Sequence, residues 1–168
     1  MLLLRSMILP AALLFAFPSR AADSLDVTPD KVLFVYDTID KASAFYVGTI
    51  RENLKKAQFL VDEASSGGLR QKDPLPYNHV VIYGMVLAFN LKSPVRDWLK
   101  SQKNLENKKI FIFVTANRWF NEKLCKELAK LATKQRATVV DAVSMATNKA
   151  TNEEKREKMM ALFSKIKK

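Results

Sequence analysis

The chain has 168 residues, 48% of them hydrophobic and 27% charged, with 28 Lys and Arg against 17 Asp and Glu. Its single cysteine excludes an intrachain disulfide framework, and no H-x-x-x-H, C-x-x-C or Walker motif supports a metal site or nucleotide hydrolysis. The net charge of +11 suits an anionic membrane, a nucleic acid or an acidic protein, but acidic residues are interspersed at helical spacing. This spacing favours an ordinary solvated surface.

The first residues of the chain predict a cleavable secretory signal. Arg5 precedes an apolar run of 11 residues, Met7–Phe17, and small side chains follow at Ser19 and Ala21. A positive start, a short apolar stretch and a small-residue exit are the pattern of a signal peptide. Cleavage is therefore expected after Ala21, with Ala22 as the near alternative.

A retained membrane anchor is the alternative interpretation, but about 18 apolar residues are needed to span a bilayer. We therefore expect residues 1–21 to be removed and residues 22–168 to form one domain of 147 residues with a net charge of +9. No cysteine lies near the cleavage point to carry a lipid, so no stable membrane anchor is expected. The mature protein is expected to be periplasmic or secreted, where it would rarely meet nucleic acid.

Five short apolar runs, rich in β-branched and aromatic residues, predict strands buried in a sheet. They are Lys31–Tyr36, Gln58–Asp62, His79–Tyr83, Lys109–Thr115 and Thr138–Ala142. Gly84 ends the third of these strands. The segment 64–76, with a Ser-Ser-Gly-Gly run and two prolines, predicts a loop in which any helix is short.

Amphipathic helices are predicted between these strands and after the last one. The first spans Ser43–Gln58 with Ser43 as its N-cap, and the second begins at Ser93 with proline in its first turn. Another spans Asn121–Lys134, and a closing helix begins with a capping box formed by Thr151 and the glutamate three residues later.

Strands that alternate with helices imply a parallel sheet covered on both faces, because right-handed crossovers place helices on each side. The fold class predicted is therefore α/β, a three-layer doubly wound sandwich around a five-stranded parallel sheet. Ligands bind such sheets beyond the carboxyl ends of the strands, where the strand order reverses. We expect the functional residues to follow Tyr36, Tyr83 and Thr115.

Three loops follow those strand ends: Asp37–Ser43, Gly84–Asn90 and Ala116–Phe120. The stretch Leu91–Leu99, in which Ser-Pro opens a helix, follows the second loop. With the element order from residue 31 to 163, these loops resemble the flavodoxin superfamily, and within it the short flavodoxin domain of menaquinone-dependent protoporphyrinogen oxidases and their relatives. The resemblance implies that flavin mononucleotide (FMN) is bound non-covalently by the three loops.

In the family, the first loop is an S/T-x-x-G-x-T turn that holds the flavin phosphate with backbone N–H groups and hydroxyls at a helix N-terminus. Thr38 and Ser43 keep two hydroxyls, but Lys41 replaces the glycine and Ala42 replaces Asn or Gln. Asp37 adds a carboxylate near the phosphate position. At ~5 Å it would repel a phosphate by roughly 1 to 3 kcal/mol, and Lys41 offers an offsetting charge.

The second loop resembles a glycine-opened turn that presents an aromatic ring, Phe89, and returns through a second glycine, replaced here by Asn90. In the third loop Trp119 would stack on the flavin and Arg118 would stabilise negative charge on its ring, unless the aromatic residues simply cap the core. The cofactor-binding residues that the resemblance implies are Thr38, Asp40, Lys41, Ala42, Ser43, Gly84, Phe89, Asn90, Thr115, Asn117, Arg118 and Trp119.

Other reactive residues have simpler interpretations. His79 opens a strand at the end opposite the ligand edge and is interpreted as a surface or edge histidine. Cys125 shares a helical stripe with leucines and is interpreted as a buried structural thiol. The carboxylates of Asp37, Asp40 and Asp62 are interpreted as solvated loop acids rather than as a paired-acid catalytic site.

Two functions of different classes remain open. The first is an exported FMN protein that transfers electrons or performs a flavin-dependent redox reaction; if it is an enzyme, it is an oxidoreductase. The second is a flavodoxin-like fold without a cofactor that serves as a binding or interaction module. A third possibility is that the basic surface and the Lys-rich last helix hold the protein on anionic lipid or on an acidic redox partner.

Overall fold

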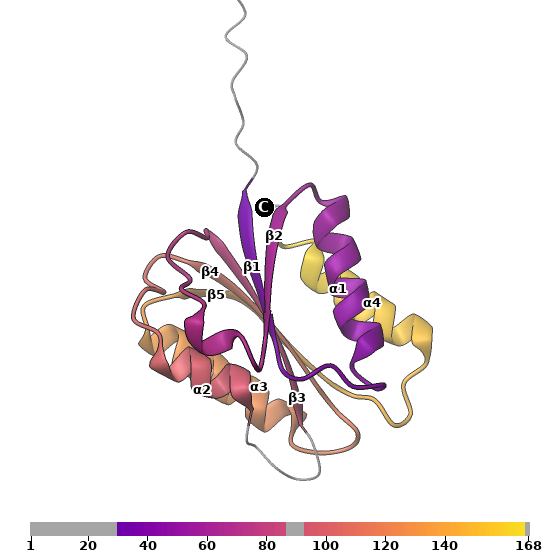
Figure 1. Cartoon of the computed structure of the whole chain (residues 1–168). Helices are drawn as coiled ribbons and strands as arrows, with labels where there is room; N and C mark the ends of the chain where they lie inside the picture. Colours follow the sequence, from indigo (N-terminus) through magenta and orange to yellow (C-terminus); the bar gives the residue numbers. More distant parts are fainter. Residues whose placement is uncertain (1–29, 87–92, 167–168) are drawn as a thin grey trace, which may run out of the picture.

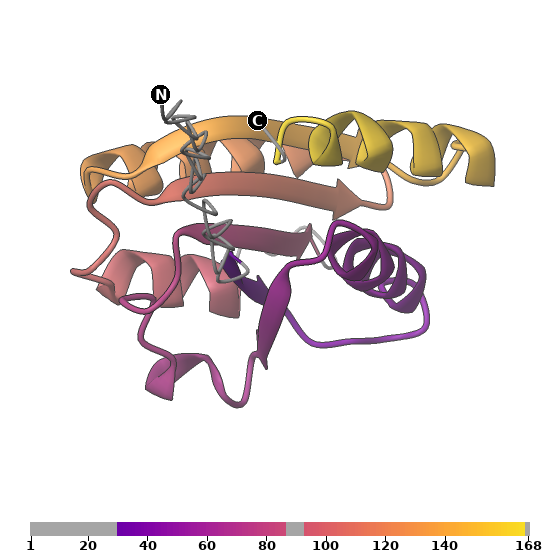
Figure 2. The ribbon, with the colours of Figure 1, turned by 90° about the horizontal axis from the view of Figure 1, so that it is seen from above.

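The computed structural model describes residues 30–86 and 93–166. Five strands form one parallel sheet in the order β2-β1-β3-β4-β5, which Figure 2 shows from above. The strands are β1 (Lys31–Tyr36), β2 (Leu60–Ser65), β3 (His79–Val86), β4 (Lys109–Ala116) and β5 (Thr138–Ala146). The α/β class and the five-stranded parallel sheet are therefore confirmed.

Four helices complete the three layers. They are α1 (Ala44–Lys56), α2 (Pro94–Ser101), α3 (Asn121–Lys134) and α4 (Asn152–Phe163). Helices α2 and α3 cover one face of the sheet, and α1 and α4 cover the other (Figure 1). A short 3-10 helix, η1 (Leu69–Gln71), lies in the segment predicted to be a loop.

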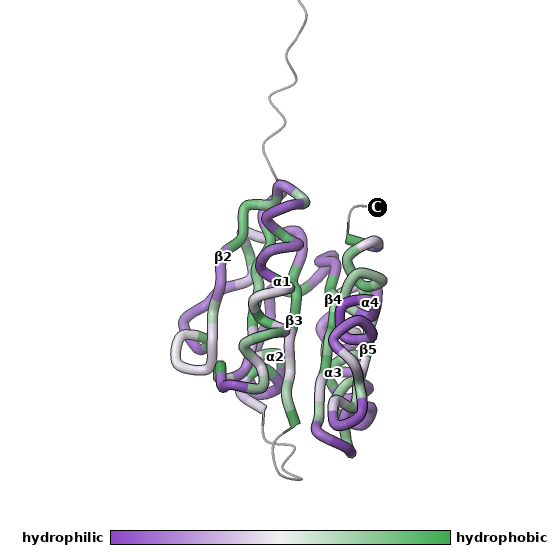
Figure 3. Tube along the Cα trace, turned by 90° about the vertical axis from the view of Figure 1, so that its right-hand side faces the viewer, coloured by the Kyte–Doolittle hydropathy of each residue, from purple (hydrophilic) through white to green (hydrophobic). Residues whose placement is uncertain are grey.

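Apolar residues fill both spaces between the layers, and Figure 3 shows the hydrophobic segments along the central strands β3 and β4. One core cluster joins β1, β3 and β4 to α2 and α3, and the other joins the opposite faces of those strands to α1 and α4. Every residue of β3 is buried. This burial on both faces explains why the strands are continuous apolar runs in the sequence.

Several strand ends differ from the prediction. β3 continues past Gly84 to Val86, where the prediction ended it at Tyr83, and β5 continues to Ala146 rather than stopping at Ala142. β2 is displaced toward its carboxyl end and stops at Ser65. The two extended strands carry the sheet further toward the edge at which ligands bind, and their ends therefore contribute to that edge.

All three predicted N-cap residues occupy the N-cap position, and two of them make capping hydrogen bonds. The Ser93 hydroxyl accepts from the Arg96 N–H, with proline in the first turn of α2. Thr151 and Glu154 form the predicted capping box of α4. Ser43 does occupy the N-cap position of α1, but its side chain makes no capping hydrogen bond.

Two of the residues set aside from the site are buried. Cys125 is 5% exposed and packs in the α3 core cluster, and burial raises the pKa of its thiol to about 11. The prediction of a buried thiol is confirmed. His79 was predicted to be a surface or edge histidine; it does open β3, but it is not at the surface, because it is 6% exposed and packs against Phe59 and Phe111. Burial is also the main cause that lowers the pKa of the His79 imidazole.

The predicted signal peptide, residues 1–21, lies outside the described residues. Among the helices of residues 30–86 and 93–166, none has the length and apolarity needed to cross a bilayer. Within the same ranges, no group of three or more His, Cys, Asp and Glu side chains is placed to hold a metal ion.

Candidate functional site

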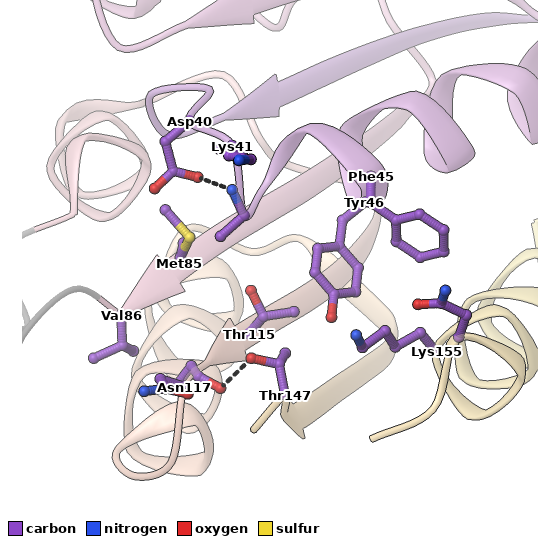
Figure 4. Close-up of a pocket in the computed structure, with 13 residues that line it drawn as sticks. Asp40, Lys41, Phe45, Tyr46, Met85, Val86, Thr115, Asn117, Thr147 and Lys155 are labelled. Carbon is purple, nitrogen blue, oxygen red and sulfur yellow. Dashed lines mark hydrogen bonds between the residues drawn. The ribbon is translucent and has the colours of Figure 1, made fainter. Parts of the chain in front are cut away.

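A pocket of about 460 Å³ opens at the carboxyl edge of the sheet, beside the first turn of α1 (Figure 4). Its volume is within the ordinary range of small-molecule sites. The lining comes from the β1–α1 loop, α1, the ends of β3 and β4, and the β5–α4 segment. The lining residues are Asp40, Lys41, Ala42, Phe45, Tyr46, Met85, Val86, Thr115, Ala116, Asn117, Thr147, Asn152 and Lys155.

The Asp40 carboxylate occupies the N-terminal turn of α1. Its Oδ1 atom accepts from the backbone N–H of Ala42 at 3.0 Å and of Ser43 at 2.7 Å. The next N–H, that of Ala44, donates to the Asp40 carbonyl oxygen at 3.0 Å. Three successive backbone donors at this helix start are therefore already bonded to oxygens of one residue.

The Asp40 carboxylate is exposed but well matched to this turn. Burial would raise the pKa of Asp40, but hydrogen bonds from Ser43 and Ala42 outweigh it and lower the pKa below the usual value. The positive end of the α1 dipole also favours the ionised carboxylate of Asp40. Asp40 is therefore an anion at neutral pH, held where a helix N-terminus would otherwise attract a ligand anion.

The hydroxyls predicted to hold a phosphate have protein partners. Ser43 is fully buried, and its Oγ accepts from the Asp40 N–H at 2.8 Å. The Thr38 hydroxyl shares a hydrogen bond of 3.0 Å with the Ser66 hydroxyl. Ser43 thus fastens the turn from inside, while Thr38 reaches to the end of β2.

Asp37 is buried, contrary to its interpretation as a solvated acid. Its carboxylate accepts from the backbone N–H of Met85 at 3.1 Å, from the N–H of Val95 at 3.0 Å and from the Ser93 hydroxyl. Desolvation outweighs these bonds and raises the pKa of Asp37. Asp37 joins the end of β1 to the end of β3 and the start of α2, and among the described residues it does not line the pocket.

Tyr46, which lines the pocket, belongs to a buried aromatic cluster. The Tyr46 ring stacks on Tyr83 with centroids 5.8 Å apart, and the Tyr83 and Thr115 hydroxyls share a hydrogen bond of 2.8 Å. The Tyr46 hydroxyl is buried and has no hydrogen-bond partner in the described part of the chain. Because burial raises the pKa of Tyr46 to about 12, this phenol stays protonated at neutral pH.

Two lysines bring positive charge to the pocket. Lys41 is exposed in the β1–α1 loop, and Lys155 is half-buried on α4. Figure 4 shows the Tyr46 hydroxyl and the Lys155 side chain pointing toward one another. A phenol and an ammonium group in this arrangement can both donate to an acceptor oxygen of a ligand.

The second predicted loop is only partly described. Gly84 lies inside β3, paired with Val114 of β4, and does not open a turn. A Cβ atom added to Gly84 would meet Leu124 and Leu128 of α3 at 3.5 Å, so this glycine faces the helix layer. Phe89 and Asn90 lie outside the described residues.

The third predicted loop divides at Asn117. Thr115 and Asn117 line the pocket, whereas Arg118 lines a separate hollow between α3, α4 and β5. Trp119 and Phe120 are 57% and 40% exposed, so they do not cap the core. Among the described residues predicted to bind a cofactor, Thr38, Ser43, Gly84, Arg118 and Trp119 are not part of the pocket lining.

Eight lining residues are not among the predicted site residues: Phe45, Tyr46, Met85, Val86, Ala116, Thr147, Asn152 and Lys155. Two of them had a usable signal. Tyr46 precedes Ile50 by one helical turn, and so shares the inward face of α1. Thr147 directly follows β5, whose true end at Ala146 was not recognised.

No protein-family model matches the sequence, and no curated protein sequence does. Solved structures do match. A flavodoxin of Streptococcus pneumoniae is 12% identical with a TM-score of 0.64, over 81% of this chain and 97% of that one. Oxidised flavodoxin 2 of Bacillus cereus is 14% identical with a TM-score of 0.63, over 80% and 97%. An oxidoreductase of Corynebacterium diphtheriae is 13% identical with a TM-score of 0.65, over 83% and 95%.

The start of α1 shows whether the residues present could hold the phosphate of FMN. The phosphate that the resemblance implies needs free N–H donors at the start of α1, but Asp40 already bonds those of Ala42 and Ser43. An ionised carboxylate at that place also repels a phosphate. The α1 turn therefore does not fit the flavin phosphate. The chain has the flavodoxin-like fold. In its first loop, the Asp40 carboxylate occupies the position at the start of α1 where an anion would bind.

Proposed function

We propose that this protein is an exported flavodoxin-like binding module whose pocket takes a small ligand other than FMN. The observation that carries this proposal is the pair of hydrogen bonds from Ala42 and Ser43 to the Asp40 carboxylate. A protein that anchored FMN by its phosphate would have to break both bonds and accept the charge repulsion. The pocket nevertheless keeps ligand-binding features of its own.

Those features lie away from the α1 turn. The Tyr46 hydroxyl is a buried donor without a partner in the described residues, and Lys155 adds a cation beside it. Buried polar groups are normally hydrogen-bonded, so an unpartnered phenol at a pocket wall favours a ligand that supplies an acceptor. The two aromatic lining residues, Phe45 and Tyr46, suit a partly apolar ligand.

The absorption spectrum of the purified mature protein tests the proposal. We expect a colourless protein that lacks the absorption bands of a flavin in the visible region. Titration with FMN should cause no saturable quenching of the flavin fluorescence. The protein should be refolded once in the presence of excess FMN, to exclude loss of cofactor during purification. A yellow protein, or stoichiometric FMN binding, would reject the proposal.

FMN-dependent electron transfer is the second candidate. It is supported by the place of the pocket at the edge where strand order reverses, and by Trp119, an exposed indole that follows β4. This candidate predicts that replacing Lys41 and Trp119 together by alanine removes a bound flavin. The matched control replaces the exposed Lys103 alone and should leave any flavin in place. If the protein binds FMN, its expected relatives are the flavodoxin domains of menaquinone-dependent protoporphyrinogen oxidases.

Export and partner choice are also part of the proposal. Removal of residues 1–21 would place the protein in the periplasm or outside the cell, and N-terminal sequencing of the processed protein is expected to start at Ala22. Four exposed lysines on one face of α3 would contact an acidic partner protein or anionic lipid: Lys123, Lys126, Lys130 and Lys134. Binding to either should weaken as ionic strength rises.

A further inference from the structure

We propose that Asp40 determines the ligand specificity of the pocket by acting as an internal anion of the α1 turn. In the wild-type protein its carboxylate excludes ligands that carry a terminal phosphate. Removal of the carboxylate opens a phosphate site at the same place. This inference rests on the proposed function of the pocket, and it adds the residue that selects the ligand class.

The geometry of the turn supports a replacement of ligand by side chain. One carboxylate oxygen accepts two backbone N–H donors, at 3.0 and 2.7 Å, which is the way a helix start holds a bound oxyanion. The loop is fastened independently of that carboxylate, because the Ser43 hydroxyl accepts from the Asp40 N–H and the Ala44 N–H donates to the Asp40 carbonyl. Loss of the carboxylate should therefore leave two donors in a preformed turn.

A second observation indicates that the surrounding pocket is built for a ligand. Tyr46 is 4% exposed and lines the pocket, yet its hydroxyl has no partner within the described residues. In Figure 4 this hydroxyl points away from Asp40, toward the space between Thr115 and Lys155. With Asp40 in place, the ligand class that fits is a phosphate-free molecule with an acceptor oxygen for Tyr46.

Titration with inorganic phosphate tests the role of Asp40. The wild-type protein and an Asp40→Ala variant are compared by calorimetry and by thermal unfolding at constant ionic strength. The alanine variant should bind phosphate at least about tenfold more tightly than wild type, because the two backbone N–H donors of the turn are freed. Its melting temperature should be lower than wild type without phosphate and should rise with phosphate. An Asp40→Gly variant, which also lacks a side-chain acceptor, provides the same comparison if the alanine variant folds poorly.

Two further variants separate occupancy from charge. In Asp40→Asn the amide oxygen can keep both hydrogen bonds while the charge is lost, so this variant should stay as weak a phosphate binder as wild type. Asp97→Ala changes the net charge by the same amount at an exposed position on α2 and should not gain phosphate binding either. Only the loss of the oxygen that fills the turn should matter.

Three results would overturn the inference. They are no gain in phosphate binding in the alanine and glycine variants, an equal gain in Asp40→Asn, and an equal gain in Asp97→Ala. Each is distinguishable from failure of the proposed function, which is read from FMN binding by the wild-type protein alone. A wild-type protein that binds no FMN, together with an Asp40→Ala variant that gains no phosphate site, would refute this inference and leave the binding module intact.

Discussion

Asp37 and Asp40 are three residues apart on one loop, but their carboxylates have different partners and opposite pKa shifts. Asp37 turns inward to the ends of β3 and α2, and burial raises its pKa. Asp40 turns outward to the start of α1; burial alone would raise its pKa, but hydrogen bonds lower it. The sequence alone treats them as equivalent loop acids. Their directions depend on the packing of distant elements, which no local pattern shows.

Replacing Asp37 by alanine should destabilise the protein by about 2–4 kcal/mol, because two backbone N–H groups and a hydroxyl lose a buried partner. Urea unfolding measures the change. Asp97→Ala, which removes a mostly exposed carboxylate from the neighbouring helix, is the control and should change stability by less than about 0.5 kcal/mol. Equal effects of the two substitutions would contradict the clamp role of Asp37.

The raised pKa of Asp37 should make the stability of the protein depend on pH. Since burial raises the pKa of Asp37, its contribution to stability is full below its unfolded pKa and is lost as pH rises through the folded pKa. An Asp37→Asn variant lacks this titration. The free energy of unfolding of wild type, measured relative to that variant, should therefore fall as the pH rises above the unfolded pKa of about 4. A difference that stays constant over that range would show that Asp37 does not titrate anomalously.

At the scale of elements, existence and type were predictable and ends were not. The sequence predicts that β2 stops at Asp62, but the strand continues to Ser65 at the edge of the sheet, where Glu63 pairs with Arg51 of α1 at 2.6 Å. It predicts that β3 stops at Tyr83, before Gly84, but this glycine lies within the strand, below α3. Both errors arise because a tertiary partner outweighs a local preference.

Gly84→Ala provides a direct check of that correction. A Cβ atom would make ordinary contacts with Leu124 and Leu128 at 3.5 Å, and replacing a strand glycine reduces the entropy of the unfolded chain. We expect stability to be unchanged or raised by up to about 1 kcal/mol. Gly84→Val, which adds methyl groups against the same leucines, should instead destabilise by about 1–3 kcal/mol. A large loss of stability in Gly84→Ala would instead support the prediction that Gly84 forms a turn.

The capping box of α4 supports the wall of the pocket that carries Lys155. The Glu154 N–H donates to the Thr151 hydroxyl at 3.2 Å, and the Thr151 N–H donates to the Glu154 carboxylate at 2.7 Å. Thr151→Ala should cost about 1 kcal/mol in chemical unfolding. Thr133→Ala within α3 removes a threonine from a helix interior and should be neutral or slightly stabilising. Similar losses of stability in the two variants would mean that the capping box does not stabilise the protein.

At the scale of the whole molecule, alternation of apolar strands and amphipathic helices was sufficient to predict the layers. The continuous run Val32–Tyr36 and the fully buried β3 read as central strands from composition alone. The site was less predictable, because its wall includes Tyr46 of α1, which stacks on Tyr83 of β3. A contact of this kind depends on how the helix packs on the sheet, which the sequence does not state.

The one cysteine provides a global probe of that packing. Cys125 is 5% exposed, and burial raises the pKa of its thiol to about 11, so a folded molecule at pH 8 holds about 100-fold less thiolate than the ordinary value allows. Iodoacetamide should modify it readily in urea and slowly in buffer. Reductant should leave the melting temperature unchanged, since the chain has a single cysteine. Fast native alkylation would contradict the packing of α3.

The two tryptophans occupy contrasting environments. Trp98 is 3% exposed and its indole N–H donates to the Lys72 carbonyl at 3.1 Å, whereas Trp119 is 57% exposed and follows a pocket residue, Asn117, by two positions. Acrylamide should therefore quench only one of the two emitters. The protein thus carries a built-in optical readout, in which Trp119 reports on events near the pocket and Trp98 reports on unfolding, without any dye or label.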